Sequence, residues 1–290
     1  MSRLVVGVPC YNEAQYIEQC LHSISKNDLS GVQVFISDNS TDGSTEVIQK
    51  FLASLPVVKR KSFKLYTWGS PVAANKNWAK SFRETDSEYF MWVGAHDMIT
   101  DNFFQTCLET FVSFPDASIV SGKPLALSQD SKRVAEVKVA YDFSSENPLE
   151  RYLKSIAELE NCTVVYSIFK KRFLREFDFP NIGSADHILL SNILWHGKLV
   201  YCEKAGYLRR MFDAEDREKK AEKGYYLNDE NRLFWYCEYM RNFIRCADGQ
   251  YPDEIYPFIK NLVFEKLCAR FGLPNTLSTA RNILAEASGL

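Results

Sequence analysis

Short apolar runs alternate with amphipathic segments over the first third of the chain, and this alternation restricts the fold more than any other feature. Four runs rich in β-branched and aromatic residues have the composition of buried parallel strands. They lie at residues 4–9, 32–37, 63–67 and 89–93. The segments between them carry apolar residues at helical spacing, for example Ile17, Leu21 and Ile24. This order predicts an α/β fold with a doubly wound, mostly parallel central sheet flanked by helices.

Acidic residues follow three of the four expected strands. They occur in the segments 9–13, 38–44 and 94–97, each of which begins where an apolar run ends. Ligands of doubly wound sheets bind outside the carboxyl ends of the strands. The three segments therefore predict a ligand crevice, and the His-Asp pair at the end of the third segment is expected to face it. Asp42, which precedes a glycine, is expected to stabilise its own turn.

The sequence after residue 120 has a less regular rhythm. Further strands are expected at 134–139, 162–169 and 198–202, and further helices at 148–159, 170–177 and from 184 onward. The stretch 213–223 is almost wholly charged, which is typical of a solvated helix face or a mobile loop. From residue 225 a helical pattern predicts a C-terminal helical subdomain that packs on the sheet or on a second copy of the chain, as a homodimer.

Charge, cysteine and hydropathy patterns narrow the class of protein. The net charge of −2 gives no attraction of the whole chain to nucleic acid, so no nucleic-acid partner is expected. The eight cysteines lack a CxxC pair or zinc-type spacing and are expected to be reduced core thiols. The sequence shows neither a signal peptide nor an apolar stretch of about 18 residues, so we expect a cytoplasmic protein. The aromatic C-terminal helices leave a peripheral membrane contact open.

Motifs along the chain resemble a known family. The stretch VGVPCYNEAQYIEQCLHSI, followed by VFISDNSTDGST, resembles the opening of the GT-A glycosyltransferases of family 2. EYFMWVGAHD lies where that family carries its metal-binding Asp-x-Asp, and SADHILL resembles the start of its acceptor-half helix. The resemblance covers roughly residues 3–212. It implies a GT-A domain (1–212) with a nucleotide-sugar half (1–120) and an acceptor half (121–212). The charge run and the helical pattern add a charged mobile loop (213–224) and a helical subdomain (225–290) after this domain.

The resemblance also implies an inverting glycosyltransferase that moves a sugar from a nucleotide-diphosphate sugar, with a UDP-sugar expected, to a hydroxyl acceptor. It suggests a saccharide or lipid-linked acceptor in polysaccharide or glycolipid biosynthesis. Four residues match the family's nucleotide contacts: Pro9, Tyr11, Glu13 and Asp38. Asp38 matches the carboxylate that reads the base, and a carboxylate can accept a hydrogen bond from the imide N–H of uracil. Asp186 matches the general base that takes the proton of the acceptor hydroxyl.

The sequence departs from the family pattern at the metal motif and beside the base. The motif reads GAHD at 94–97, so both positions of a strict Asp-x-Asp have lost their aspartate. The last acidic position, Asp97, matches a nucleotide contact and, with His96 beside it, is expected to bind a divalent cation, Mn²⁺ or Mg²⁺. The family's glutamate before the base is Ala185.

Arg209 or Arg210 is expected to offset diphosphate charge, which matters most if the metal site is weak. Capping of the following turn is an alternative role for Asp38, and capping of a helix near Thr100 is one for Asp97. A degenerate GT-A module that holds a nucleotide or a partner without catalysis is the alternative for the whole chain. A nucleotidyltransferase would need a glycine-rich phosphate loop after the first strand, where this sequence has PCYN.

Overall fold

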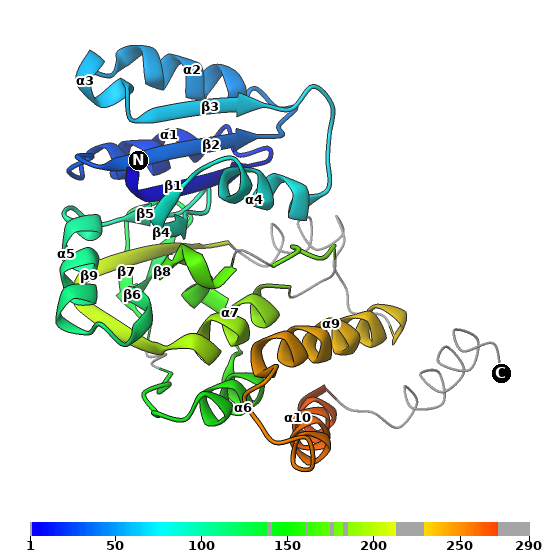
Figure 1. Ribbon diagram of the computed structural model, residues 1–290. Coiled ribbons are helices and arrows are strands. Elements are labelled where there is room, and N and C mark those ends of the chain that lie inside the picture. Colours follow the sequence, from blue (N-terminus) through cyan, green and yellow to red (C-terminus); the bar gives the residue numbers. More distant parts are fainter. Residues whose placement is uncertain are drawn as a thin grey trace.

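The computed structural model describes residues 2–137, 141–160, 162–174, 177–181, 185–212 and 229–271. At 229–236 and 270–271 the description covers the backbone only. A nine-stranded sheet forms the centre, with the strand order β3-β2-β1-β4-β8-β6-β9-β5 and with β7 paired to β6. Helices flank this sheet, and a hydrophobic core lies on each of its faces, so the predicted α/β fold is confirmed (Figure 1).

The first four strands form the parallel half of the sheet. They are β1 (Ser2–Cys10), β2 (Val32–Asp38), β3 (Phe63–Thr67) and β4 (Ser87–Trp92). The helices between them are α1 (Ile17–Ser25), α2 (Ser44–Ser54), the short α3 (Val57–Arg60) and α4 (Ala74–Arg83). β1 pairs in parallel with β2 on one side and with β4 on the other. The turns that follow these three strands, which are predicted to form the ligand crevice, are therefore neighbours at one edge of the sheet.

The second half of the sheet is mixed. β8 (Ile168–Lys170) runs antiparallel to both β4 and β6 (Ala117–Ser128). Beyond it, β6 pairs in parallel with β9 (Lys198–Met211), and the short β5 (Met98–Ile99) and β7 (Val134–Glu136) pair antiparallel with β9 and β6. β9 is much longer than the strand expected at 198–202, and the expected boundary at residue 120 falls inside β6.

The apolar segment 162–169 is not the continuous strand expected from the sequence. Cys162–Tyr166 is a 3-10 helix (η1), and strand pairing starts only at Ile168. Val164 and Val165 are both buried, because a tight helical turn can bury consecutive side chains that a strand would point to opposite faces. The apolar residues of this run do not alternate with polar ones as in a half-buried strand. The strand prediction rested on composition alone, and it was wrong for residues 162–166.

The remaining helices of this half are α5 (Phe103–Ser113), α6 (Pro148–Glu158), α7 (Ala185–His196) and the 3-10 turn η2 (Lys171–Leu174). A basic helix is expected at 170–177 from the sequence. In the described part of this range only η2 is helical, Lys170 ends β8, and residues 175–176 lie outside the description. Lys171 is buried there and donates to the Thr85 carbonyl, so this basic side chain is not part of a solvated helix face.

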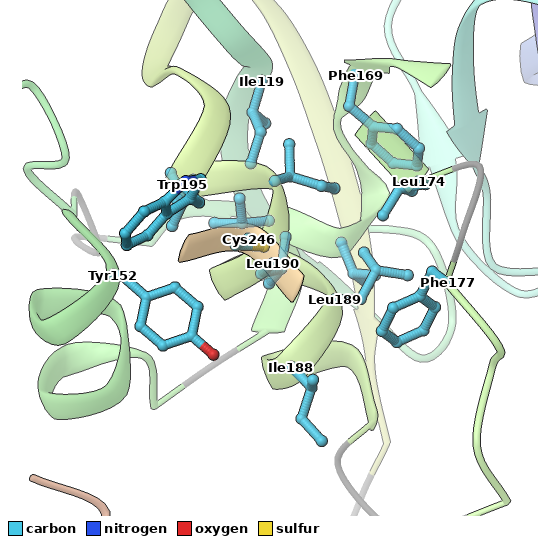
Figure 2. Close-up of a cluster of buried hydrophobic side chains, with 14 of the residues drawn as sticks. Ile119, Tyr152, Phe169, Leu174, Phe177, Ile188, Leu189, Leu190, Trp195 and Cys246 are labelled. Carbon is cyan, nitrogen blue, oxygen red and sulfur yellow. The ribbon is translucent and has the colours of Figure 1, made fainter. Parts of the chain in front are cut away.

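α7 is the central helix of one core. Residues 188–195 are buried throughout, which is the pattern of a helix surrounded by protein. Figure 2 shows its side chains spreading into different parts of this core, with Ile188, Leu189, Leu190 and Trp195 among the labelled residues. Arg151 of α6 donates to the carbonyls of Leu194 and Trp195 at 2.7 and 2.8 Å. These bonds satisfy carbonyls in the last turn of the helix that carries Asp186 in its first turn.

The C-terminal helices predicted from the sequence are present. α9 (Asp229–Ala247) and α10 (Tyr256–Phe271) pack beside α6 and α7, at the end of the molecule away from α2 and α3 (Figure 1). Tyr239 and Phe243 of α9 are buried in the same core as α7. The charged loop expected at 213–224 lies outside the described residues, as do 225–228 and 272–290. None of the described helices is both long enough and apolar enough to cross a membrane.

Candidate active site

The turns after β1 and β2 are fastened to each other. The Glu13 N–H donates to the Ser44 hydroxyl at 3.0 Å, and the Ala14 N–H donates to the Asp42 carboxylate at 3.2 Å. Asp42 also accepts from the Ser44 N–H at 3.0 Å and from the Ser44 hydroxyl. Burial opposes ionisation of Asp42, but the hydrogen bonds from Ser44 and Ala14 outweigh it and lower the pKa of this carboxyl. The prediction that Asp42 stabilises the turn is confirmed.

Asp38 is the last residue of β2 and lies below this turn. It is only 2% exposed, and its two oxygens accept from the Ser40 N–H at 3.1 Å and from the Thr45 hydroxyl at 2.5 Å. It therefore caps its own turn, as the alternative reading expects, but each carboxylate oxygen keeps a second lone pair for another donor. Tyr11 is 48% exposed, whereas Pro9 lies within β1 in register with Ser37 of β2.

The Glu13 carboxylate and the His96 ring form a hydrogen-bonded pair. Glu13 Oε1 lies 2.8 Å from His96 Nδ1, and Asp97 Oδ1 lies 3.8 Å from His96 Nε2. With an ionised carboxylate as acceptor, Nδ1 carries the proton, and in the neutral ring Nε2 then holds the lone pair. Histidines that bind metal ions usually donate their other ring N–H to a carboxylate in this way. The pair therefore fits a metal ligand, His96, that is oriented by Glu13.

Asp97 points into the protein. It is 1% exposed, and it accepts from the Tyr207 hydroxyl and from the Arg210 backbone N–H, both at 2.7 Å. The Tyr207 hydroxyl accepts in turn from the Gly94 N–H at 3.1 Å. Burial and the Asp97 charge raise the pKa of Tyr207 well above its usual value, so the hydroxyl keeps its proton for this bond. Asp97 therefore ties the turn after β4 to β9.

Two features of the sequence around this turn follow from the position of Asp97. A Cβ atom at Gly94 would lie 2.6 Å from Asp97 Oδ2, which is closer than real Cβ contacts. The inward Asp97 and the missing aspartate at position 94 are thus linked, because both side chains would need the same space. Helix α5 begins only at Phe103, so the alternative that Asp97 caps a helix near Thr100 is wrong.

The two arginines of β9 differ in how their side chains are used. Arg210 is buried and donates to the carbonyls of His96 and Gln129, the Ser131 hydroxyl and the Gln19 side chain. In these bonds the guanidinium donates to protein groups and helps to fix the turn after β4, which Asp97 also holds. Arg209 is half-buried, and it donates to the Thr163 hydroxyl at 3.1 Å.

A cavity of about 790 Å³ lies between the two halves of the domain. Its wall combines the start of α4, η1, the start of α7 and the end of β9. Apart from Tyr166, the charged or titratable residues that line it are Glu160, Cys162, Asp186, His187, Arg209 and Arg210. Phe212 also lines it and meets the His96 ring edge-on at 5.1 Å. The residues predicted to bind nucleotide at the ends of β1, β2 and β4 lie outside this lining.

The predicted base, Asp186, opens on this cavity from the first turn of α7. Its Oδ1 accepts from the His187 N–H at 3.1 Å, at a helix end that favours negative charge. The Cys162 thiol lies beside it. Burial, the charge of Asp186 and a hydrogen bond to this carboxylate raise the pKa of Cys162. The thiol therefore keeps its proton beside this carboxylate.

Two residues that shape the site, Tyr207 and Cys162, were not identified from the sequence. Tyr207 lies in the segment GYLRR, but its partners Asp97 and Gly94 are 110 and 113 positions away. Cys162 belongs to the segment expected to be a strand, and its contact with Asp186 depends on the 3-10 turn. The tyrosine two positions before Arg209 was the available signal for Tyr207.

Comparison with known proteins decides the family. The sequence model described as "Glycosyl transferase family 2" matches residues 5–177, which is more than half of the chain. The chain belongs to glycosyl transferase family 2. The resemblance read from the N-terminal motifs is thereby confirmed, together with the GT-A fold.

Two curated relatives of this family 2 chain are glycosyltransferases. The processive diacylglycerol beta-glycosyltransferase of Mycoplasma pneumoniae is 26% identical over 113 residues, which is 38% of this chain and 32% of the relative. Glycosyltransferase GlyA of Streptococcus pneumoniae serotype 4 is 20% identical over 225 residues, which is 72% of this chain and 31% of the relative. The chain spans about a third of the length of these relatives.

Solved structures share the fold at low sequence identity. A fragment of S. aureus TarS in complex with UDP-GlcNAc has a TM-score of 0.62 and 16% identity, with 96% of this chain and 75% of that chain covered. The mannosyltransferase PcManGT from Pyrobaculum calidifontis, in complex with GDP-Man and Mn²⁺, has a TM-score of 0.56 and 18% identity. That match covers 99% of this chain and 75% of the other.

Proposed function

We propose that this chain is an inverting glycosyltransferase that moves a sugar from a UDP-sugar to a hydroxyl of a saccharide or lipid-linked acceptor. The observation that carries this proposal is the position of Asp186, which lines a cavity walled by both halves of the domain. The relatives support the substrates: TarS structures hold UDP and UDP-GlcNAc, and the M. pneumoniae relative is named for transfer to diacylglycerol. The reaction would serve polysaccharide or glycolipid biosynthesis, in the cytoplasm or at the inner face of the membrane.

The end of β2 is the proposed site of the nucleobase. Asp38 retains acceptor capacity beyond its bonds to Ser40 and Thr45, and the imide N–H of uracil is a suitable donor. The exposed ring of Tyr11 offers a flat face for stacking on the base. Pro9, near the end of β1, and Glu13, in the turn after it, are assigned to the ribose side.

The diphosphate is proposed to lie against His96, with Arg209 supplying positive charge from β9. A divalent cation, Mn²⁺ or Mg²⁺, would be held by His96 and Asp97 and would stabilise the charge that grows on the departing diphosphate. Glu13 leaves Nε2 of His96 as a ligand atom, and Asp97 Oδ1 lies 3.8 Å from that nitrogen. Arg209 adds a guanidinium that can donate charge-assisted hydrogen bonds to phosphate oxygens.

Asp186 is the proposed general base. Its carboxylate takes the proton of the acceptor hydroxyl while that oxygen attacks the anomeric carbon on the face opposite the diphosphate. The cavity beside it is lined by the rings of Trp78 and Tyr166, whose faces suit the apolar face of a sugar or the apolar part of a lipid-linked acceptor.

A non-catalytic GT-A module that holds a nucleotide or a partner is the second candidate. Two observations favour it: Ala185 stands where the family has a glutamate, and Gly94 stands where it has the first aspartate of its metal motif. Such a module would bind nucleotide but would not depend on Asp186. Turnover that is lost in Asp186→Asn separates the two candidates.

The C-terminal helices supply the surface for the proposed contacts outside the active site. Ile255, just before α10, and Phe258 and Leu262 of α10 are exposed apolar side chains, and Phe258 is 74% exposed. Such residues suit the contacts predicted for this subdomain, a peripheral membrane surface or a second copy of the chain.

Thermal unfolding with UDP, GDP, CDP and dTDP, each with Mn²⁺ or with EDTA, tests the donor site. A ligand at 100 times its Kd stabilises the folded chain by about 2.7 kcal/mol. We expect a shift selective for UDP that is lost in Asp38→Ala and kept in Asp186→Asn. No shift with any nucleotide would contradict the donor assignment. An equal shift in EDTA would contradict only the role of the cation in binding.

A further inference from the structure

Three side chains of different chemistry meet in the wall of the cavity. A ligand atom from each of Cys162, Asp186 and His187 lies within 4.8 Å of the other two. They come from two elements, because Cys162 opens η1 and the other two lie in the first turn of α7. A thiol, a carboxylate and an imidazole together are a ligand set for Zn²⁺ and related borderline-soft cations.

The spacing of these atoms is close to that of a metal site. In a tetrahedral zinc site, bonds of about 2.0–2.3 Å place neighbouring ligand atoms roughly 3.3–3.8 Å apart. Side-chain rotations that move the ligand atoms by about 1 Å would therefore bring them from within 4.8 Å of one another to the spacing of a zinc site. All three residues are half-buried and line the cavity, so an ion has an entry path and a fourth position for water.

The charges of the cavity wall balance one another. Asp186 and Glu160 are its acidic lining residues, and Arg209 and Arg210 are its basic ones. The Cys162 thiol, with its proton, lies beside Asp186. A bound ion would replace this proton: the S–H bond breaks, the proton passes to solvent, and a sulfur lone pair binds the ion. The ion would also occupy an oxygen of Asp186.

We propose that Cys162, Asp186 and His187 form a site for a zinc-class divalent cation, and that the bound ion blocks Asp186 as a base. Binding at this site does not depend on the proposed function, whereas inhibition does. The site differs in chemistry from the one assigned to His96, because a thiolate prefers Zn²⁺ or Co²⁺ over the hard ions Mg²⁺ and Mn²⁺. Zinc-class ions therefore inhibit under conditions where Mn²⁺ and Mg²⁺ do not.

Titration of the full chain with Co²⁺, followed by the thiolate-to-cobalt absorption band, tests the site directly. The wild type is compared with Cys162→Ser, with His187→Ala and with the control Cys237→Ser, which removes an exposed thiol of α9. We expect one equivalent of Co²⁺ to give the band in the wild type and the control. Cys162→Ser should lose the band, and His187→Ala should bind at least about ten-fold more weakly. No band in the wild type, or an unchanged band in Cys162→Ser, overturns the site.

A second measurement tests the block. UDP release from the donor is measured with increasing Zn²⁺ in the wild type and in Cys162→Ser. We expect Zn²⁺ to stop release in the wild type and to act at least about ten-fold more weakly on the variant. Zinc-insensitive release by a wild-type chain that binds Co²⁺ overturns the block. Failure of every preparation to release UDP contradicts the proposed function instead, and the Co²⁺ result stands on its own.

Discussion

Removal of the Tyr207 hydroxyl tests how the turn after β4 is held. In Tyr207→Phe, the Asp97 carboxylate loses a donor at 2.7 Å and the Gly94 N–H loses its acceptor at 3.1 Å. A hydrogen bond to a charged group contributes about 1.5–3 kcal/mol, and a buried unpaired N–H costs about 1–3 kcal/mol. Asp97 keeps its bond from the Arg210 N–H, so we take the lower part of the sum, about 3 kcal/mol.

Urea unfolding followed by circular dichroism measures this loss, and for a chain of this size it corresponds to a fall in Tm of roughly 6 °C. Tyr166→Phe is the matched control, because the Tyr166 ring stacks on Tyr207 with centroids 5.0 Å apart. No hydrogen bond to its hydroxyl is found among the described residues, so its change should stay near 0.5 kcal/mol. Equal unfolding free energies for the two variants would refute the reasoning that Asp97 fastens the turn through Tyr207.

Three further changes have expected outcomes in the same unfolding assay. Arg151→Met leaves the carbonyls at the end of α7 without their donor and should lower the free energy of unfolding by about 2–4 kcal/mol. The control Arg245→Met removes an exposed ion pair and should lower it by under about 1 kcal/mol. Equal losses in the two variants would contradict the buried role of Arg151. Gly94→Ala places a Cβ against Asp97 and should lower the free energy of unfolding by about 1–3 kcal/mol. In the control Gly69→Ala the new Cβ meets no atom within 4 Å, so this change should be neutral or slightly stabilising. A neutral Gly94→Ala would show that Asp97 moves freely. Asp42 has a lowered folded-state pKa, so its contribution is present above about pH 4 and is lost as the pH falls through the folded value. Asp42→Asn should cost about 1 kcal/mol at pH 7 and progressively less as the pH falls below about 4. A loss that does not shrink as the pH is lowered would contradict the ionic origin.

The parallel half of the fold was predictable because its information is local. Apolar runs with turn residues at their ends mark β1, β2 and β4, and the topology of such sheets brings their ends together. The Glu13–His96 pair was not predictable, because its atoms meet across 83 positions. The inward turn of Asp97 likewise depends on a glycine at 94 and a tyrosine on β9. The segment of η1 was wrongly predicted as a strand, because its apolar residues follow neither helical nor strand periodicity. A tight turn with buried apolar side chains has the same composition as a buried strand.

Release of UDP by the wild type and by Asp186→Asn tests the central claim most directly. A panel of UDP-sugars is offered with saccharide and lipid-linked hydroxyl acceptors, and calorimetry confirms that both proteins bind UDP. The account predicts release with at least one donor, a loss of at least about hundred-fold in Asp186→Asn, and unchanged UDP affinity. UDP binding with no release from any pair, or equal release by Asp186→Asn, would contradict the assignment of Asp186 as the base of a glycosyl transfer.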